Sequence, residues 1–203
     1  LPRVGAPEPS PDGTFVVVPV ATYDMDANEG TTRLWRIPTD GGPGTPLTSE
    51  GVSSTQPAIS PDGARLAFVR KPGGKPGDAD KAARPGQARY GDQPQVYVLP
   101  LGGGEPERVT DVPLGSSSPR WFPDGRRIAF LAQVYRDAPD LAATAERAKA
   151  LADDPVKARV TEDRFYRYWD HWLTDGKVHH VFALDLATRD VLDLTPTLHG
   201  WMP

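Results

Sequence analysis

The sequence predicts an all-β protein built from three copies of a four-stranded antiparallel unit. Three features predict this fold class: a turn motif, a strand that carries an aromatic residue, and a threonine that ends a short strand each occur three times in the same order. The 203 residues include 23 Pro and 20 Gly, which suits many short strands joined by turns. The hydrophobic share of 38% argues against a disordered chain.

The turn motif is Ser-Pro-Asp-Gly at 10–13 and 60–63, and Phe-Pro-Asp-Gly at 122–125. Pro presets the backbone for a type I turn, Asp suits the next position, and Gly takes the left-handed conformation that closes a hairpin with a bulge. An apolar run follows each copy: TFVVVPV, ARLAFVR and RRIAFLA. We therefore expect three hairpin tips with a structural role. Because Phe122 replaces the serine in the third copy, we interpret the serine as dispensable to the turn.

Two further strands complete each unit. The aromatic strands are RLWRIP, QVYVLP and HVFALD, which carry Trp35, Tyr97 and Phe182. The short last strands end at Thr48, Thr110 and Thr195. The interval from the threonine to the Asp of the next turn is identical both times that it can be measured. The units therefore run over about 4–48, 54–110 and 116–195.

The second strand of a unit is apolar on both alternating faces, with Leu66 and Phe68 on one face and Ala67 and Val69 on the other. A strand covered on both sides needs neighbours above and below its sheet, which stacked propeller blades supply. We therefore predict a partial β-propeller of three blades with a helical insert in the third. Propellers close with about four to eight blades, so we expect 196–203 to begin a fourth blade and the remaining blades to lie outside this chain. Exposed blade edges would then promote association.

The link between the second and third strands varies in length from blade to blade, spanning about 24–32, 71–94 and 133–178. In an up-and-down blade this link always emerges on the same face of the disc, and in repeat proteins the face that bears insertions is often the binding face. The alternative is that insertions collect wherever loops are tolerated. The 71–94 insert is rich in Gly, Pro and charged residues, and we expect it to be a mobile loop.

The 133–178 insert contains a predicted amphipathic helix over 140–154, with Pro139 in its first turn. Its apolar stripe consists of Leu141, Ala145, Ala148 and Ala152. The densest aromatic and charged cluster of the chain follows, and its candidates for contact with a substrate or another domain are Tyr166, Arg167, Trp169, Asp170, His171 and Trp172. Such side chains line clefts and anchor partner surfaces. Alternatively, they pack the insert onto its own blade.

We find no motif for catalysis or for a bound metal or cofactor. The GxSxG pentapeptide of α/β-hydrolases is absent, and so are the glycine patterns of nucleotide-binding loops. The four histidines, His171, His179, His180 and His199, lack the HExxH spacing. We therefore expect no catalytic residue, no metal and no cofactor in this chain. A net charge of -4 does not favour binding to nucleic acid or to an anionic membrane, so neither is an expected partner.

The SPDG turn followed by two strands is similar to the TolB-like propeller blade. A more specific combination is the opening RVGAPEPSPDGTFVVVPVATYDMDANEGTTRLWRIPTDGG with VTEDRFYRYWDHWLTDGKVHHVFALDLATRDVLDLTP near the end. This combination resembles the N-terminal propeller of bacterial prolyl oligopeptidase family serine peptidases, on the acylaminoacyl-peptidase and dipeptidyl-peptidase side. The resemblance covers essentially the whole chain, and YRYWDHWLTDGK is its most discriminating part.

The resemblance implies a seven- or eight-bladed propeller followed by a C-terminal α/β-hydrolase domain with catalytic Ser, Asp and His. In that family the propeller covers the active site and admits only short peptides. The remaining blades, the hydrolase domain and a short peptide are thus the expected partners, and no catalytic residue can be carried over to this chain. The dipeptidyl-peptidase branch uses a helical pair of glutamates that this sequence lacks, which favours acylaminoacyl- or oligopeptidase activity. The alternative is a non-catalytic TolB-like propeller that binds a partner protein.

Overall fold

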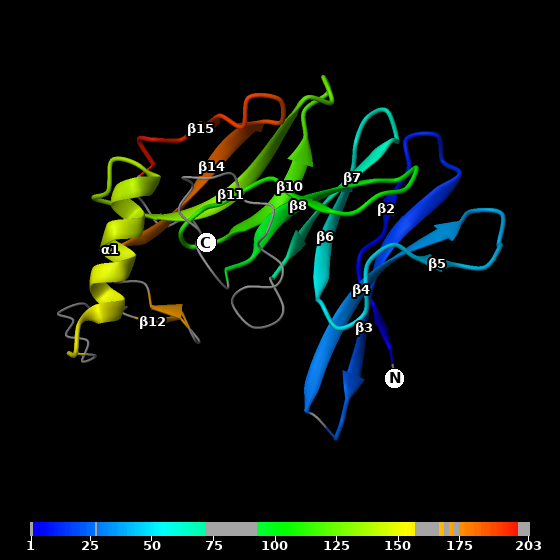
Figure 1. Ribbon diagram of the computed structural model, residues 1–203, viewed down its shortest axis with the longest axis horizontal. Coiled ribbons are helices and arrows are strands. Elements are labelled where there is room, and N and C mark those ends of the chain that lie inside the picture. The colour runs from blue at the N-terminus through cyan, green and yellow to red at the C-terminus, as the bar shows by residue number, and fades with distance from the viewer. Residues whose placement is uncertain are drawn as a thin grey trace.

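The computed structural model describes residues 2–26, 28–71, 93–156, 167–168, 171–172 and 175–198. These residues form three large antiparallel sheets and a separate two-stranded one. The three large sheets are called blades 1 to 3 in chain order and follow one another from blue to red in Figure 1. Within each blade the strands pair in the order in which they occur in the sequence. The structure thus confirms the predicted all-β fold with three repeated sheets.

The strands of blade 1 are β1 (Arg3–Val4), β2 (Glu8–Pro9), β3 (Phe15–Asp24), β4 (Glu29–Pro38) and β5 (Thr45–Pro46), with β1 and β2 both paired to β3 as a split first strand. Blade 2 contains β6 (Ser54–Ile59), β7 (Arg65–Arg70), β8 (Gln95–Pro100) and β9 (Glu107–Arg108). Blade 3 contains β10 (Ser116–Trp121), β11 (Arg127–Tyr135), β14 (Lys177–Asp185) and β15 (Val191–Asp193). Between β11 and β14 lie α1 (Leu141–Asp153), β12 (Arg167–Tyr168) and β13 (His171–Trp172).

The three turns have the geometry that their sequence predicts. Gly13, Gly63 and Gly125 have φ angles of 71°, 69° and 63°, in the left-handed region. In the second turn, Gly63 N donates to Ser60 O at 2.8 Å, and Ser60 N donates to Arg65 O at 2.8 Å. The serine contributes more than expected, because its hydroxyl donates to Asp62 Oδ1 and accepts from Arg65 N. Asp62 also accepts from Ala64 N, and Asp124 accepts the equivalent bond from Arg126 N. In the third turn, which lacks the serine, Asp124 accepts from Arg127 N as well.

The hydrophobic core lies between neighbouring blades. One cluster joins blades 1 and 2, and a second joins blades 2 and 3. Each contains an aromatic pair from the second and third strands of the later blade: Phe68 and Tyr97 with ring centroids 6.0 Å apart, then Phe130 and Phe182 at 5.6 Å. Strands that are apolar on both faces therefore pack against a blade on each side, as their sequence pattern predicts.

The first and third links between the second and third strands are shorter than their sequence suggests, whereas the second runs from β7, which ends at Arg70, to β8, which begins at Gln95, as predicted. In blade 1, β3 ends at Asp24 and β4 begins at Glu29, so most of the 24–32 link belongs to a hairpin. In blade 3, β11 and β14 remain paired up to Tyr135 and Lys177, inside the predicted 133–178 insert. Residues 72–92 of the second insert and the end of the predicted fourth-blade segment, 199–203, lie outside the described residues.

Helix α1 confirms the predicted helix but differs from it in two details. It begins after Asp140, whose side chain caps the helix by accepting from Ala143 N at 2.8 Å, so Pro139 precedes the cap and is not in the first turn. Its buried residue is Thr144, next to the predicted stripe, while Ala152 is exposed. The stripe therefore holds at Leu141, Ala145 and Ala148, which are half-buried, and does not extend to Ala152. Nowhere in the described ranges is a helix long and apolar enough to cross a membrane.

Candidate functional site

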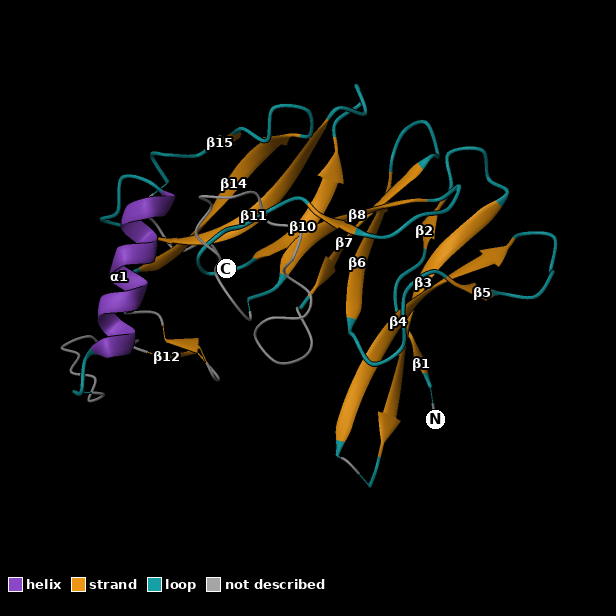
Figure 2. Cartoon of the chain, in the orientation of Figure 1, coloured by secondary structure: helices purple, strands orange, loops and turns teal. Residues whose placement is uncertain are grey.

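The links that carry the insertions emerge on one face of the assembly, and the Pro-Asp-Gly turns emerge on the other. Figure 2 shows the turns after β2, β6 and β10 at the upper edge and the hairpin between β3 and β4 at the lower edge. We call the side with the β3–β4 hairpin and the two longer links the insert face. Two clefts lie on this side, so it is the candidate functional surface.

The predicted cluster is only partly described by the structure. Tyr166, Trp169 and Asp170 lie outside the described residues. Arg167 pairs with Trp172 in the short hairpin of β12 and β13, where Tyr168 pairs with His171. This places the backbone of three candidate residues in a hairpin that follows α1. Their contact with a substrate or with another domain stays a prediction.

The larger cleft, of about 560 Å³, lies between the start of α1 and the outer strands of blade 3. Its apolar residues are Val134, Leu141, Phe182, Val191 and Pro196. Its polar residues include Arg136, Asp140, His180 and Asp193. Its volume lies in the range of about 300–1,000 Å³ that small-molecule sites occupy, and its apolar wall suits a hydrophobic side chain.

The contacts of His180, the imidazole in this cleft, indicate a structural role. His180 is 6% exposed, its Nδ1 lies 2.6 Å from Asp193 Oδ2, and its Nε2 lies 2.8 Å from Leu198 O. Gln95 holds the corresponding place in blade 2, and its Nε2 donates to Val112 O at 2.9 Å. Each of these two side chains forms a hydrogen bond between the third strand of its blade and the segment that follows the blade. The role of His180 is therefore structural. His179 points to the opposite, exposed side of the strand, as the strand alternation predicts.

The smaller cleft, of about 300 Å³, lies between blades 2 and 3. Its polar lining includes Thr55, Gln56, Lys71, Ser117, Gln133 and His179. Gln56 and Ser118 have φ angles of 53° and 52°, which is unusual for residues other than glycine, and Gln56 Oε1 accepts from Ser118 N at 2.6 Å. Uncharged amides and hydroxyls of this kind suit the main chain of a peptide. Among the described residues, no group of acidic or histidine side chains could hold a metal ion.

The threonines that end the short last strand of each unit have a hydrogen-bonding role that the sequence alone did not reveal. Thr110 Oγ1 accepts from Val96 N at 2.8 Å, and Thr195 Oγ1 accepts from Val181 N at 3.0 Å. Thr48 does the same for Leu34 N at 3.0 Å. Likewise, Gln95 and His180 occupy equivalent repeat positions with different residue types. Aligning the three units residue by residue would have shown that these positions are equivalent, but not which hydrogen bonds they make.

Comparison with known proteins supports a peptidase-like propeller. No protein-family model matches the chain. An uncharacterized peptidase of Bacillus subtilis, YuxL, is 33% identical over 122 residues, which covers 60% of this chain and 16% of the relative. Dipeptidyl-peptidase 5 of Porphyromonas endodontalis is 25% identical over 204 residues, covering 98% of this chain and 25% of the relative. The chain thus spans a quarter or less of the length of these relatives.

Solved structures show the same fold. Acylaminoacyl peptidase of Pyrococcus horikoshii matches 95% of this chain with 24% of its own, at a TM-score of 0.63 and 16% identity. A TolB-like protein of Agrobacterium tumefaciens matches 95% of this chain with 49% of its own, at a TM-score of 0.53 and 19% identity. The three sheets are therefore blades of a β-propeller similar to those of peptidases and TolB-like proteins.

Proposed function

We propose that this chain is part of a propeller that covers the active site of a serine peptidase and limits access to short peptides, in an enzyme of the acylaminoacyl- or oligopeptidase type. The observation that carries the proposal is the similarity to a dipeptidyl-peptidase over 98% of the chain. The catalytic residues would lie in another domain of the same protein. In this proposal the insert face is the side that meets the peptide.

The chemistry of the described residues fits a role in access and binding. The larger cleft combines an apolar wall with charged groups such as Arg136 and Asp140, and the smaller one is lined mainly by amides and hydroxyls with Lys71, which suits peptide side chains and peptide amides. The buried pair of His180 and Asp193 does not resemble a catalytic dyad, because the second ring nitrogen lies against a main-chain carbonyl and not a nucleophile. We therefore assign positioning of substrates, and no chemical step, to these blades.

The proposal is tested by removing the third insert from the full-length protein. Arg136 N donates to Gly176 O at 2.8 Å, so a two-residue turn can replace 137–175 without stretching the sheet. Loss of a gate should raise kcat/KM for peptides of more than ten residues by about tenfold and change it little for blocked dipeptides. A variant shortened in the hairpin at 25–28 serves as the control for a trimmed loop on the same face. An unchanged length preference in a folded, active variant would contradict the gating role.

A second candidate is a non-catalytic TolB-like propeller that binds a protein partner. The fold similarity to the TolB-like protein of Agrobacterium tumefaciens supports this alternative. The two candidates differ in the polypeptide that follows these blades. A GxSxG motif with a later Asp and His, together with labelling of the full-length protein by a fluorophosphonate, supports the peptidase. A coding sequence that ends after the last blade supports the binding protein.

A further inference from the structure

The lining of the smaller cleft is rich in groups that donate hydrogen bonds, and it carries a positive charge. Lys71 and His179 line it, whereas no acidic residue does among the residues that the structure describes. Its hydroxyl and amide side chains are Ser53, Thr55, Ser116, Ser117, Gln56 and Gln133. The chain as a whole has more acidic than basic residues, 27 against 23. A lining without acids therefore favours an anionic ligand over a cationic one.

Two consecutive cations lie where β7 ends. Lys71, which follows β7 and is exposed, forms no ion pair with a carboxylate in the described ranges. The half-buried Arg70 donates from Nε to Ser54 Oγ at 3.3 Å, and its Nη2 has no hydrogen-bond partner within the described residues. Because cations without a neutralising partner attract anions, this end of blade 2 favours a negatively charged ligand.

The backbone beside the cleft is held in an unusual conformation. Gln56 and Ser118 are the left-handed residues of two equivalent bulges, where the pairing register shifts between β6 and β7 and between β10 and β11. Each of them precedes a proline, which disfavours helical backbone angles in the residue before it. Such strain persists only where the surrounding structure imposes it, and it is concentrated at binding and catalytic sites. The fold therefore imposes the position of Gln56.

The amide group of Gln56 is oriented by the next blade. Its Oε1 accepts from Ser118 N at 2.6 Å. Because a main-chain N–H can only donate, this contact identifies the amide oxygen and leaves Nε2 as a donor. Within the described part of the chain, Nε2 forms no hydrogen bond. Gln56 thus offers an oriented N–H donor in the same cleft as Lys71.

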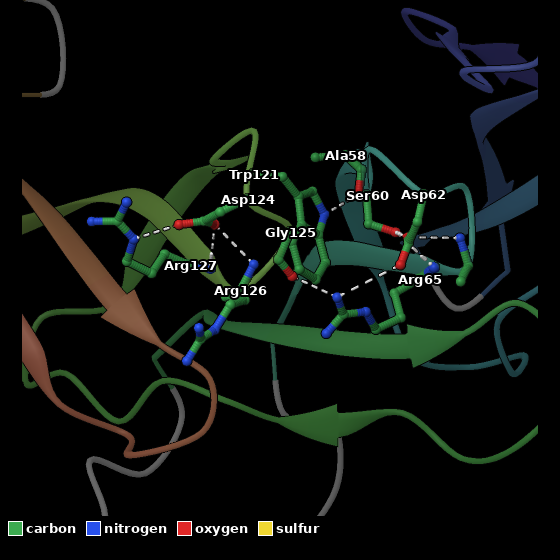
Figure 3. Close-up of polar contacts among 10 residues, drawn as sticks. Ala58, Ser60, Asp62, Arg65, Trp121, Asp124, Gly125, Arg126 and Arg127 are labelled. Atoms are coloured by element: carbon green, nitrogen blue, oxygen red, sulfur yellow. Dashed lines mark hydrogen bonds and ion pairs between the residues drawn. The ribbon is translucent and has the colours of Figure 1, made fainter.

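The two walls of the cleft are fixed relative to each other. On the opposite side of the interface between blades 2 and 3, Arg65 Nη2 donates to Gly125 O at 2.5 Å, and its guanidinium lies 4.7 Å from the ring centroid of Trp121 (Figure 3). Trp121 Nε1 donates to Ala58 O at 2.9 Å. These bonds and the buried cluster between the blades maintain the shape of the cleft before a ligand binds. A preformed site favours affinity because less conformational freedom is lost on binding.

Apolar side chains complete the cleft. They include Val69, Leu114 and Leu131, and the volume of about 300 Å³ lies at the lower end of the range for small ligands. A ligand that satisfies both parts of the cleft has a carboxylate next to an apolar side chain. The C-terminal residue of a peptide has this combination, whereas an Asp or Glu residue within a peptide does not.

We propose that the smaller cleft binds the C-terminal residue of a peptide and recognises its free carboxylate. Lys71 supplies the charge, Gln56 Nε2 donates a hydrogen bond to the carboxylate, and the apolar side chains contact the terminal side chain. This inference rests on the proposed function only in taking a peptide as the ligand. It gives that function a specificity: peptides with a free, apolar C-terminal residue bind in preference to those with a blocked one.

The test compares two probes on the full-length protein. Each is a fluorescein-labelled tripeptide that ends in leucine and is N-methylated at its peptide bonds to prevent hydrolysis, one with a free carboxylate and one with a C-terminal amide. Fluorescence polarisation measures their Kd values. We expect the free acid to bind about tenfold more tightly than the amide, because a charge-assisted hydrogen bond is lost with the carboxylate. Equal Kd values overturn the proposal.

A third probe identifies the source of the carboxylate. It carries aspartate in place of the terminal leucine and ends in an amide. We expect it to bind as weakly as the leucine amide. If it instead binds as tightly as the free acid, the cleft takes an acidic side chain and the assignment to a C-terminal residue is wrong.

Substitutions at Lys71 and Gln56 assign the preference to this cleft. Lys71→Met should reduce the preference for the free acid to less than about twofold, whereas Lys149→Met, at an exposed residue of α1 outside the cleft, should leave it unchanged. Gln56→Glu keeps an acceptor for Ser118 N but places a negative oxygen where Nε2 was. It should therefore weaken binding of the free acid about tenfold and leave binding of the amide unchanged.

The outcomes separate this inference from the proposed function. Equal effects of Lys71→Met and Lys149→Met mean that net charge alone decides binding, which overturns the role of Lys71. Unchanged binding of the free acid to a folded Gln56→Glu variant overturns the role of Gln56. Peptidase activity is measured separately on an unmethylated peptide. Its absence with the preference intact contradicts only the proposed function, and equal binding of acid and amide by an active peptidase contradicts only this inference.

Discussion

Replacing Arg65 with methionine tests how much the contact between turns stabilises the stack of blades. Arg65→Met keeps the length of the side chain and removes the donor to Gly125 O and the charge over Trp121. A hydrogen bond to a charged group contributes about 1.5–3 kcal/mol, and a cation–π contact at an exposed site about 0.5–1 kcal/mol. Because the Arg65 side chain is 33% exposed, the lower ends apply. We expect the free energy of unfolding to fall by about 2 kcal/mol.

Arg127→Met is the matched control, because the same residue type at the equivalent position contacts its own turn, through an exposed pair with Asp124 and a cation–π contact with Phe122. Its expected cost is below about 1 kcal/mol. Urea denaturation of the 203-residue chain, followed by circular dichroism and by tryptophan fluorescence, measures both variants. Equal losses for the two variants would refute the argument, since they would mean that the bond between blades adds nothing to a surface ion pair.

Two further predictions concern single sites. Thr110→Val preserves the shape of the side chain, but it leaves Val96 N without its acceptor and removes one of the two donors to Gln95 Oε1, in a site that is 2% exposed. The free energy of unfolding in urea should therefore fall by about 2–3 kcal/mol. A similar loss for Thr188→Val, at an exposed residue, would contradict this reasoning. Hydrogen bonds from Ser60 Oγ and Ala64 N hold the pKa of Asp62 below its usual value of 3.8, so its charged form favours the folded state at neutral pH and that stabilisation is lost as the pH falls through the depressed pKa. Asp62→Asn should therefore reduce the decline of Tm between about pH 4 and pH 2. If Tm falls by the same amount over this range in both proteins, the carboxylate does not contribute.

The repeat could be predicted from the sequence because each turn and each strand depends on residues that are close together in the chain. Gly63 needs a left-handed backbone, and strands such as 65–70 need two covered faces, so turns and strands could be located without a structure. The contacts between blades were not predictable in the same way. Arg65 reaches Gly125 across a long separation in sequence, and Phe15 holds the corresponding place in blade 1, so no repeated letter marks the contact.

The candidate site was less predictable than the fold. The aromatic cluster from Tyr166 to Trp172 was selected by residue type, which indicates contact area but does not indicate which surface it meets. The apolar stripe assigned to α1 missed Thr144, because a polar residue becomes buried when a neighbouring backbone group bonds it, as Tyr135 N does. The larger cleft lies between α1 and the strands of blade 3, and the smaller one lies between blades 2 and 3. No single stretch of sequence contains either of them.

The base of the third insert explains how one blade can tolerate so long an addition. β11 and β14 remain in unbroken register from Arg127 opposite Asp185 to Tyr135 opposite Lys177, and the bond from Arg136 N to Gly176 O continues this ladder to the first residue outside it. The two ends of the insert are therefore held at the spacing of an ordinary hairpin. Sequence can be gained, lost or exchanged beyond this point while the hydrogen-bonded register stays the same, and the cost of a longer loop grows only slowly with its length. The site between Arg136 and Gly176 is thus a natural graft point, where new specificity can evolve without refolding the blade.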